Sequence, residues 1–416
     1  MSSYQLIRSN PNFRLAWFGM FISRLGDGLY SVAIIWMTYQ IAKSGLALGI
    51  VLGAFTFSTF ISGILAGVVA DRMNRRTLMM GSSLLCGVTV ILIPLAFYWE
   101  ILNLPLLAFL SFVLGAFTQF FEPVVKASVF NLVSKEELTQ GNAALGTTES
   151  MGYLVGPPLG GILITWFSTE MVLVLNGITF ILAALLISRI KTPLSNISKS
   201  TTPNKWTLDL KEGLQFIKEN KSVRRLFLIS ILATIAYSPF FVNLPIFLDQ
   251  GLTLSSEEQP TFLGILYSVL ALGQFIGFWV VGYLPDNIRV NLTVGYLLQT
   301  IGFGLLSVLS NPFTIVVSVT IAGISFGLAA APFYTAIQRL VPNRLHGRVF
   351  GVQSTLDGFL LPAGRTITGG ALEYFSARSI FLFMGVLYFI NAFLPNLISN
   401  SRSISHSTER LEKIRK

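Results

Sequence analysis

The chain has 416 residues, of which 53% are hydrophobic and 12% are charged, and its formal net charge at pH 7 is +10. Soluble domains carry about 25% charged residues, so this chain lacks the polar surface of an aqueous fold and is predicted to be an integral membrane protein. The basic excess would suit nucleic-acid binding, but the lysines and arginines are spread over many short segments between apolar stretches. This spread excludes a nucleic-acid partner and indicates that the basic residues fix the membrane topology.

A transmembrane helix needs about 20 predominantly apolar residues, and the sequence offers twelve stretches of that kind. Nothing alternates between polar and apolar residues over the roughly ten positions of a membrane barrel strand. The predicted fold class is therefore an all-α membrane protein with twelve transmembrane helices. In chain order, the stretches lie near residues 12–41, 45–70, 77–98, 103–130, 139–166, 170–188, 225–248, 260–283, 289–309, 312–338, 346–374 and 379–398.

The polar start of the chain leads into a hydrophobic run that is too long for a signal peptide, so we expect no cleaved leader and a cytoplasmic N-terminus. In that orientation most of the 29 lysines and arginines fall in cytoplasmic segments, while Lys43 and Arg378 lie outside. Both termini are then cytoplasmic. The single cysteine, Cys86, lies within a span, so no disulfide framework is possible. The prediction is a monomeric, multi-pass protein of the cell (inner) membrane, surrounded by the lipid bilayer.

The two halves of the chain are related. PVVKASVFNLV at 123–133 recurs as PFYTAIQRLV at 332–341, and the Leu-Val pairs in the two copies are 208 residues apart. Between the copies lies a long polar segment that is rich in basic residues. The predicted organisation is an N-terminal six-helix bundle, a basic cytoplasmic linker, a C-terminal six-helix bundle and a basic tail, over residues 1–188, 189–224, 225–400 and 401–416.

The linker contains an amphipathic segment. Trp206, Leu210, Leu214 and Ile217 fall on one helical face, with lysines opposite. Such a helix either lies on the inner leaflet of the membrane or packs as a solvated linker helix on the floor of the bundle. The sequence leaves both arrangements open.

Two six-span repeats joined by a basic loop are a transporter architecture, and the loop GVVADRMNRR at 67–76 resembles the signature loop of the major facilitator superfamily. Segments such as RLGDGLY at 24–30 and HGRVFG at 346–351 resemble the branch that holds macrolide-efflux proteins and the enterobactin exporter, and the resemblance covers the whole chain. The loop after the eighth span, YLPDNIR, keeps only Asp286 and Arg289 of the signature. The signature residues are Gly67, Asp71, Arg72, Arg75 and Arg76, and a motif similar to that of the superfamily's antiporters comprises Gly152, Gly156, Pro157, Pro158, Gly160 and Gly161.

The resemblance implies that the Asp71 carboxylate meets the start of a helix in the other half, where the helix dipole favours a negative charge. The expected partner is the helix start at Gly347 and Arg348, and the contact would latch the cytoplasmic side in one conformation. Alternatively, the loop only anchors the topology through its positive charge. Anchoring explains the three arginines of the loop but accounts poorly for the aspartate.

Glycines four residues apart let helices approach closely. The resemblance implies that the second, fifth, eighth and eleventh spans form the seam between the halves, where small residues suit rocking of one bundle against the other. Such glycines are Gly49/Gly53, Gly63/Gly67, Gly152/Gly156/Gly160, Gly273/Gly277, Gly347/Gly351 and, in the tenth span, Gly323/Gly327.

Charged side chains within a span are costly unless they are paired or protonated, so they mark candidate functional residues. Arg24 and Asp27 are three residues apart and either neutralise each other or line a central cavity and bind polar substrate groups. Arg365 is a further charge within a span. Glu149 and Asp357 have no basic residue three or four positions away and are 208 residues apart, at equivalent positions of the two halves. They are candidates for proton coupling, with Asp27 as a third, or they are permanently protonated structural acids.

The resemblance also implies which side chains face the substrate. In the superfamily fold the first, fourth, seventh and tenth spans line the central cavity, and a mixture of aromatic and polar groups suits bulky ligands. Besides Arg24 and Asp27, the expected lining residues are Trp36, Tyr39, Gln119, Tyr237, Asn243, Phe333 and Tyr334.

The sequence contains no G-x-x-x-x-G-K-[ST] stretch, so a P-loop nucleotide site is absent. The two histidines, His346 and His406, are both cytoplasmic, and we expect no metal, no cofactor and no enzyme. The sequence therefore indicates a secondary active transporter that exports amphiphilic small molecules, antibiotic-like or siderophore-like, in exchange for protons. The alternatives are a lipid or lysophospholipid facilitator and a membrane receptor that binds without transporting.

Overall fold

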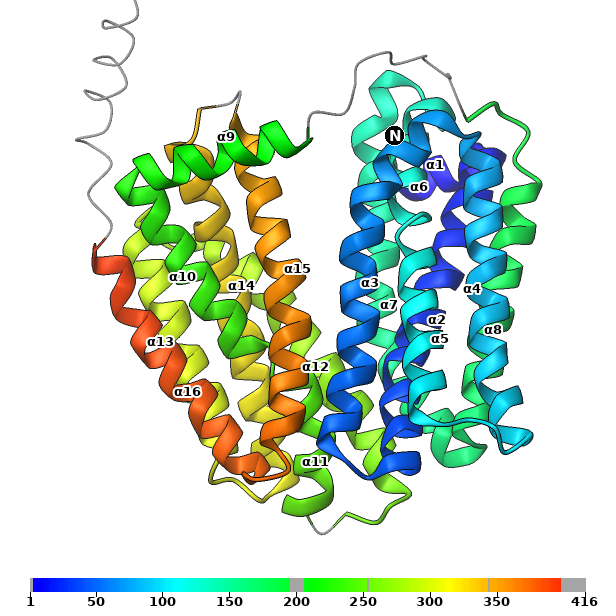
Figure 1. The fold of residues 1–416 in the computed structure, drawn as a ribbon. Helices are drawn as coiled ribbons and strands as arrows, with labels where there is room; N and C mark the ends of the chain where they lie inside the picture. Colours follow the sequence, from blue (N-terminus) through cyan, green and yellow to red (C-terminus); the bar gives the residue numbers. More distant parts are fainter. Residues whose placement is uncertain (1–2, 195–205, 253, 343–344, 398–416) are drawn as a thin grey trace, which may run out of the picture. The chain divides into compact units, whose positions relative to one another are not determined.

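The computed structural model describes residues 3–194, 206–252, 254–342 and 345–397, and the regular elements in these ranges are all helical (Figure 1). The α-helices are α1 (Ser3–Ser9), α2 (Pro11–Ala42), α3 (Gly45–Arg72), α4 (Arg75–Tyr98), α5 (Leu104–Thr118), α6 (Glu122–Leu132), α7 (Leu138–Trp166), α8 (Thr169–Ser188), α9 (Trp206–Glu219), α10 (Lys221–Tyr237), α11 (Phe240–Gly251), α12 (Glu258–Val280), α13 (Ile288–Leu306), α14 (Pro312–Leu340), α15 (His346–Ala371) and α16 (Ala377–Phe393). Short 3₁₀ turns are η1 (Lys135–Glu137), η2 (Val281–Tyr283) and η4 (Leu394–Leu397).

Each predicted stretch is largely helical, but two of them are interrupted. The stretch at 103–130 is divided into α5 and α6, and the stretch at 225–248 is divided into α10 and α11. A proline lies at each break, Pro123 in the first turn of α6 and Pro239 just before α11. Proline has no backbone N–H and is tolerated at the start of a helix but not in its interior, so each chain segment ends one helix and begins another there.

Eight segments within the described residues are long and apolar enough to cross a membrane by length and composition. Their presence agrees with an all-α membrane protein. The prediction of twelve crossings with both termini in the cytoplasm goes beyond this finding and stays a prediction.

Short polar side chains set where eight of the described α-helices begin. Each accepts a hydrogen bond from a backbone N–H in the first turn, which would otherwise have no partner within the helix. Ser44, for example, accepts from the backbone N–H of Ala47 at 3.3 Å and starts α3. The capping residues are Asn10, Ser44, Asn74, Asn103, Ser168, Asn220, Asn287 and Asn311.

The chain divides into two compact units. Unit 1 comprises residues 1–202, 240–271 and 361–377, and unit 2 comprises the remaining residues. Unit 1 therefore contains α1 to α8 together with α11, the first part of α12 and the last part of α15. The predicted division at 188 and 225 assigns these three later segments to the second half. That division follows the sequence repeat and stays a prediction.

In unit 1, α2 packs against α7 and α8, α4 packs against α8, and α3 packs against α5. Figure 1 shows α2, α3, α4, α7 and α8 running side by side along the length of this unit. The turns at 43–44, 99–103, 167–168, 254–257 and 372–376 lie at the end of unit 1 away from α1. We call this end the distal end.

In unit 2, α13 packs along α14, and Figure 1 shows α9 crossing the ends of α10 and α15. Gly213 of α9 lies so close to α15 that a Cβ there would be 2.7 Å from the carbonyl oxygen of Arg348. Ile217 is 7% exposed, whereas Leu214 is 54% exposed. The amphipathic helix thus packs against α15 within unit 2, and the choice between the two arrangements stays a prediction.

Candidate functional site

A cavity of ≈ 380 Å³ lies inside unit 1, where α2, α3, α5, α7, α11, α12 and α15 meet. We call it the central cavity. It combines aromatic and aliphatic walls with a few hydroxyl, amide and charged groups. Its described lining consists of Arg24, Asp27, Tyr30, Ser31, Ile34, Ile35, Val51, Leu52, Phe55, Thr59, Leu114, Thr118, Gln119, Tyr153, Phe241, Tyr267 and Arg365.

Arg24 and Asp27 of α2 form an ion pair in the wall of this cavity. Nη1 of Arg24 donates to Oδ2 of Asp27 at 3.1 Å, and the two side chains are 17% and 32% exposed. Three residues of helix place both side chains on the same face. Arg24 and Asp27 therefore pair with each other and also line the cavity. Their role in substrate binding stays a prediction.

Arg365 of α15 reaches the same cavity from another element. Its Nη1 donates to the hydroxyl of Thr56 and, at 3.4 Å, to the backbone carbonyl of Leu52, both on α3. Its guanidinium carbon lies 5.5 Å from the ring centroid of Phe241 on α11, within the range of a cation–π contact. From the sequence we identified Arg365 as a charge within a span but predicted no role for it. Its contacts at the cavity are with residues far away in the sequence, so no local pattern reveals them.

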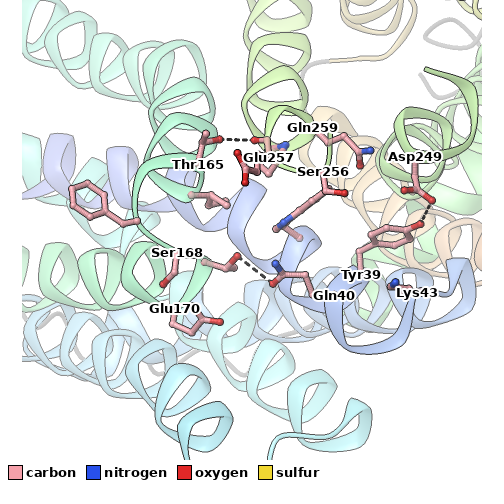
Figure 2. A pocket seen from close by; sticks show the side chains of 15 residues that line it. Tyr39, Gln40, Lys43, Thr165, Ser168, Glu170, Asp249, Ser256, Glu257 and Gln259 are labelled. Carbon is pink, nitrogen blue, oxygen red and sulfur yellow. Dashed lines mark hydrogen bonds between the residues drawn. The ribbon is translucent and has the colours of Figure 1, made fainter. Parts of the chain in front are cut away.

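A second cavity, of ≈ 520 Å³, lies at the distal end of unit 1 (Figure 2). We call it the distal cavity. Trp36 and Tyr39 line this cavity, and their predicted contact with substrate stays a prediction. On α2 they lie closer to the distal end than Arg24 does (Figure 1). The charged residues of the described lining are Lys43, Glu170, Asp249 and Glu257, and the others are Trp36, Tyr39, Gln40, Ile164, Thr165, Phe167, Ser168, Thr169, Ser256, Gln259 and Pro260.

Hydrogen bonds at the distal end join the N-terminal helices to α11, α12 and the turn after α15. The hydroxyl of Tyr39 donates to Oδ2 of Asp249 at 2.5 Å, and the hydroxyl of Thr165 donates to the carbonyl of Glu257 at 2.8 Å (Figure 2). Oε1 of Glu373 accepts from the Ser44 hydroxyl at 2.7 Å. We call these three bonds the distal contacts. They tie α2, α7 and the start of α3 to segments from the second half of the sequence.

Glu373 lies in the exposed turn beyond α15, next to the N-terminus of α3. Besides the hydroxyl of Ser44, the backbone N–H of Leu46 donates to its carboxylate at 3.3 Å. The Ser44 hydrogen bond, followed by that of Leu46, holds the pKa of Glu373 below its usual value near 4.5. The negative charge therefore supports this contact above the usual pKa. The support is lost only when the pH falls through the lowered pKa.

We expect Glu373→Gln to loosen the first turn of α3, because the variant keeps the size of the side chain but loses the negative charge at a helix N-terminus. Hydrogen–deuterium exchange of the peptide that begins at Gly45 should be faster in the variant at neutral pH. The difference from the wild type should vanish in acid below the pKa of Glu373. Glu100→Gln, in the neighbouring turn of the distal end, is the control and should exchange like the wild type. Equal exchange in all three proteins would contradict the contact.

The other predicted cavity residues are dispersed. Gln119 lines the central cavity, and its contact with substrate stays a prediction. Asn243 is fully buried and donates from Nδ2 to the carbonyl of Ala377 at 2.9 Å, so it lines neither cavity. Tyr237, Phe333 and Tyr334 belong to unit 2 and also line neither cavity. The ring of Tyr237 packs against Phe326, and the rings of Phe333 and Tyr334 pack against each other.

The two candidate proton-coupling acids lie in different settings. Glu149 is half-buried on α7 of unit 1. Asp357 on α15 accepts from the Thr234 hydroxyl at 2.8 Å and from Nε2 of Gln353 at 3.0 Å, both within unit 2. From the sequence we interpreted Asp357 as an acid without a nearby counter-charge. In the structure two neutral groups, the Thr234 hydroxyl and the Gln353 amide, donate hydrogen bonds to its carboxylate. A role in coupling stays a prediction for both acids.

Of the predicted signature loop, Gly67, Asp71 and Arg72 lie outside the residues whose side chains the structure describes. Arg75 donates to the side chain of Asn131 and to the carbonyl of Leu194, both at 3.4 Å, and Arg76 is half-buried. The latch between Asp71 and the start of α15 stays a prediction.

Arg348, the expected partner of that latch, forms an ion pair with Glu212 of α9. This pair joins the linker helix to the start of α15 within unit 2. Sequence spacing gave no sign of it, because the two residues are 136 positions apart.

The motif at 152–161 binds α7 to two helices. Gly152, Gly156 and Gly160 face α2, and a Cβ on Gly156 would lie 2.6 Å from the Cα of Gly28. Gly161 faces the backbone of Pro260 and Thr261 at the start of α12. On the same helix, Gly264 of α12 faces the backbone of Pro157 and Pro158. The small residues of this motif thus let three helix backbones approach within van der Waals distance.

The other predicted glycine pairs differ in their neighbours. Gly49 and Gly53 of α3 face α15 at Pro362, Arg365 and Thr366, in agreement with a seam of the second and eleventh spans. Among the described residues, a Cβ on Gly63 would lie 3.8 Å from the Gln119 side chain. Gly273 and Gly277 pack on Gly323 and Gly327 of α14 within unit 2, and a Cβ on Gly347 or Gly351 would have no described atom within 4 Å.

We expect Gly156→Ala to destabilise the fold, because the new methyl group would collide with the backbone of α2 and overpacking costs about 1–3 kcal/mol. Gly146→Ala on the same helix is the matched control. It adds the same methyl group where no described atom lies within 4 Å, so it should keep or slightly raise stability, since alanine favours helix over glycine by about 1 kcal/mol. Thermal unfolding in detergent measures both variants. Equal melting temperatures would contradict the backbone contact.

Comparison with known families places this geometry in context. The family model described as Major Facilitator Superfamily matches residues 16–364. Macrolide efflux protein A of Streptococcus pyogenes is 24% identical over 413 residues, covering 94% of this chain and 97% of that protein. Multidrug efflux pump Tap of Mycolicibacterium fortuitum is 25% identical over 391 residues, covering 89% of this chain and 93% of that protein.

Solved structures share the fold at lower identity. The crystal structure of nucleoside transporter NupG aligns with a TM-score of 0.75 and 13% identity, over 93% of this chain and 98% of that one. A bacterial homologue of the human lysosomal transporter Spinster aligns with a TM-score of 0.72 and 14% identity, over 97% and 98% of the two chains. These likenesses concern the fold.

Proposed function

Since the chain belongs to the major facilitator superfamily, whose model matches residues 16–364, we propose that it exports amphiphilic small molecules, antibiotic-like or siderophore-like, by alternating access and in exchange for protons. Membership of this family makes the chain a multi-pass transporter of the cell (inner) membrane and not an enzyme. Export as the direction, and amphiphiles as the class, are supported by relatives named as macrolide and multidrug efflux proteins.

The central cavity is the observation that carries the proposal. Its ≈ 380 Å³ fits a small molecule, since ligand sites range over about 300–1,000 Å³. Rings such as those of Tyr30, Phe55 and Phe241 offer contact area to an apolar body, and the Arg24–Asp27 pair offers hydrogen bonds to polar groups. A cavity of this kind binds amphiphiles through a few polar anchors and a large apolar wall.

Alternating access follows from the predicted topology. With twelve crossings and both termini in the cytoplasm, the distal end faces the outside of the cell. The distal contacts would then close the outer side of the central cavity, and release of substrate to the outside would require breaking bonds such as Ser44–Glu373 and Tyr39–Asp249. Each joins a hydroxyl to a carboxylate near the surface, and hydrogen bonds to charged groups are worth about 1.5–3 kcal/mol. Closure of this strength is readily reversible.

Exchange for protons requires a carboxyl group whose proton affinity changes with conformation or occupancy. Hydration of a carboxyl favours the ionised form and burial favours the protonated form. Asp27 lines the central cavity, so an entering ligand changes its surroundings directly. Glu149 and Asp357 lie on helices α7 and α15, which contribute to the predicted seam. We propose these three acids as the proton-coupling groups of a monomeric antiporter.

Uptake into inverted membrane vesicles tests this function. A labelled macrolide and a labelled ferric siderophore serve as probes, with a pH gradient imposed across the vesicle wall. The proposal predicts uptake of at least one probe that depends on the gradient, together with counterflow in proteoliposomes. Counterflow without any effect of the gradient would indicate a facilitator. Binding without counterflow would indicate a receptor.

A further inference from the structure

The distal cavity places a carboxylate beside an aromatic pair. Trp36 and Tyr39 of α2 both line it, and their ring centroids lie 6.0 Å apart with 41° between the ring planes. The Tyr39 hydroxyl donates to Oδ2 of Asp249 at 2.5 Å (Figure 2), so this hydrogen bond holds a negative group next to the rings. Trp36 is 5% exposed, and packing keeps its indole in the wall. Aromatic faces and carboxylates both attract an ammonium group.

The charged groups of the distal cavity are mostly acidic. Its described lining carries Glu170, Asp249 and Glu257 together with Lys43, which are three carboxylates against one ammonium group. Within the part of the chain that the structure describes, none of these four side chains forms an ion pair. The cavity therefore attracts a cation. Asp249 and Glu257 are exposed, so dissolved salt weakens this attraction.

Gln259 adds a buried acceptor to the same wall. Its side chain is 4% exposed and lines the cavity (Figure 2). Its Nε2 donates to the carbonyl of Leu254 at 3.4 Å, whereas among the described residues no group donates to its Oε1. An amide oxygen in such a place takes its hydrogen bond from water or from a ligand. An ammonium group carries three donors and no acceptor, so it fits this wall.

The arrangement suits an organic cation better than a metal ion. Among the described residues, no three acidic, histidine or cysteine side chains gather in a way that could hold a metal ion. The cavity measures ≈ 520 Å³, and small-molecule sites range over about 300–1,000 Å³. Its acids come from α8, α11 and the turn before α12. Carboxylates on separate elements surround a ligand whose charge sits on a larger body.

We propose that the distal cavity binds an organic ammonium ion with an aromatic or hydrocarbon body. Trp36 and Tyr39 contact the ligand through their rings. Asp249 and Glu257 attract its charge, and Gln259 accepts one of its N–H groups. The two cavities share no described lining residue, so this site is distinct from the central cavity and goes beyond the proposed transport function.

Three naphthalene probes of similar size separate charge from apolar contact. These are naphthalen-1-ylmethylammonium (cationic), naphthalen-1-ylmethanol (neutral) and naphthalene-1-carboxylate (anionic). Each is titrated into the full-length protein in nanodiscs of zwitterionic lipid, with empty nanodiscs as the background. We expect the cation to bind about tenfold more tightly than the alcohol, which corresponds to about 1.4 kcal/mol, and the anion to bind less tightly than the alcohol. A wild-type protein that binds the cation no better than the alcohol would overturn the inference.

Substitution of Glu257 assigns the preference to this cavity. Its side chain is exposed, and the hydrogen bond from Thr165 is to its backbone carbonyl, so the substitutions leave that bond in place. Glu257→Gln should lower the preference for the cation, and Glu257→Lys should abolish it. Glu136→Gln is the matched control, since Glu136 is an exposed acid of unit 1 that lines neither cavity. A full preference for the cation in Glu257→Lys would sink the proposal.

Salt identifies the kind of attraction and the kind of cation. Raising the concentration of NaCl from about 0.02 M to about 0.5 M should reduce the preference severalfold, because it shortens the range of electrostatic attraction. An unchanged preference would contradict a role for the carboxylates. MgCl₂ at the same ionic strength should compete no better than NaCl. Displacement of the cationic probe by much less MgCl₂ than NaCl would assign the acids to a metal ion and contradict the organic class.

The outcome is independent of the transport assay. Gradient-driven uptake in a protein that shows no preference for the cationic probe would contradict the distal site and leave the transport function intact. A preference for the cation that depends on Glu257, in a protein without counterflow, would contradict transport and leave the distal site intact.

Discussion

Arg24→Ala and Asp27→Ala should each reduce stability and transport more than the double variant does. The pair lies in the cavity wall, and removal of one partner leaves the other charge without its 3.1 Å neighbour. For fully buried pairs that loss costs about 3–5 kcal/mol. Because the side chains are 17% and 32% exposed, we expect about 1–3 kcal/mol for each single variant after allowing for screening by cavity water.

Thermal unfolding and counterflow, measured on the two single variants and the double variant, decide what the pair does. A double variant that is more stable and more active than either single variant supports neutralisation within the pair. The opposite result is a double variant that is as inactive as the single ones, with all three proteins as stable as the wild type. It would show that the pair binds the substrate and does not only neutralise its own charges.

Glu149→Gln and Asp357→Asn should abolish transport driven by a pH gradient while substrate binding and counterflow persist. Each variant mimics the protonated acid and cannot release a proton. Uptake into inverted vesicles with an imposed gradient measures coupling, and counterflow in proteoliposomes measures the uncoupled cycle. Of the two we favour Glu149, because it shares α7 with the motif at 152–161, which contacts both α2 and α12.

A control separates proton release from hydrogen bonding at Asp357. Thr234→Val removes the 2.8 Å donor to Asp357 but leaves the carboxyl group in place. It should keep gradient-driven uptake if the titrating acid is what matters. Full uptake in both Glu149→Gln and Asp357→Asn would show that another group carries the proton, and Asp27 would be the next candidate.

Hydropathy alone predicted the helical class, because a membrane span must be a continuous run of apolar residues. It did not predict the divisions between α5 and α6 or between α10 and α11. The mean hydropathy of an apolar stretch changes little when it contains Pro123 or Pro239. The missing N–H of proline nevertheless ends the helical hydrogen-bonding pattern.

Arg24, Asp27 and Gln119 line the central cavity, because a charged or amide group within a span turns to a polar interior. Their contact with substrate stays a prediction. Trp36 and Tyr39 line the distal cavity instead, because the depth of a side chain depends on where its helix lies in the bundle. The partner of Arg348, Glu212 on α9, lies far away in the sequence, and no local pattern encodes such a pair.

Cross-linking of the distal end tests alternating access most directly. A Cβ on Gly45 would lie 2.7 Å from the Cβ of Leu372, so a small outward shift brings a Gly45→Cys, Leu372→Cys pair to the roughly 3.5–4.5 Å of a disulfide. The chain has one native cysteine, the buried Cys86, which Cys86→Ala removes as a background. We predict that oxidation of the pair stops counterflow and that a reductant restores it, while neither single-cysteine protein responds. Full counterflow by the cross-linked protein would contradict opening of the distal end as a step of transport.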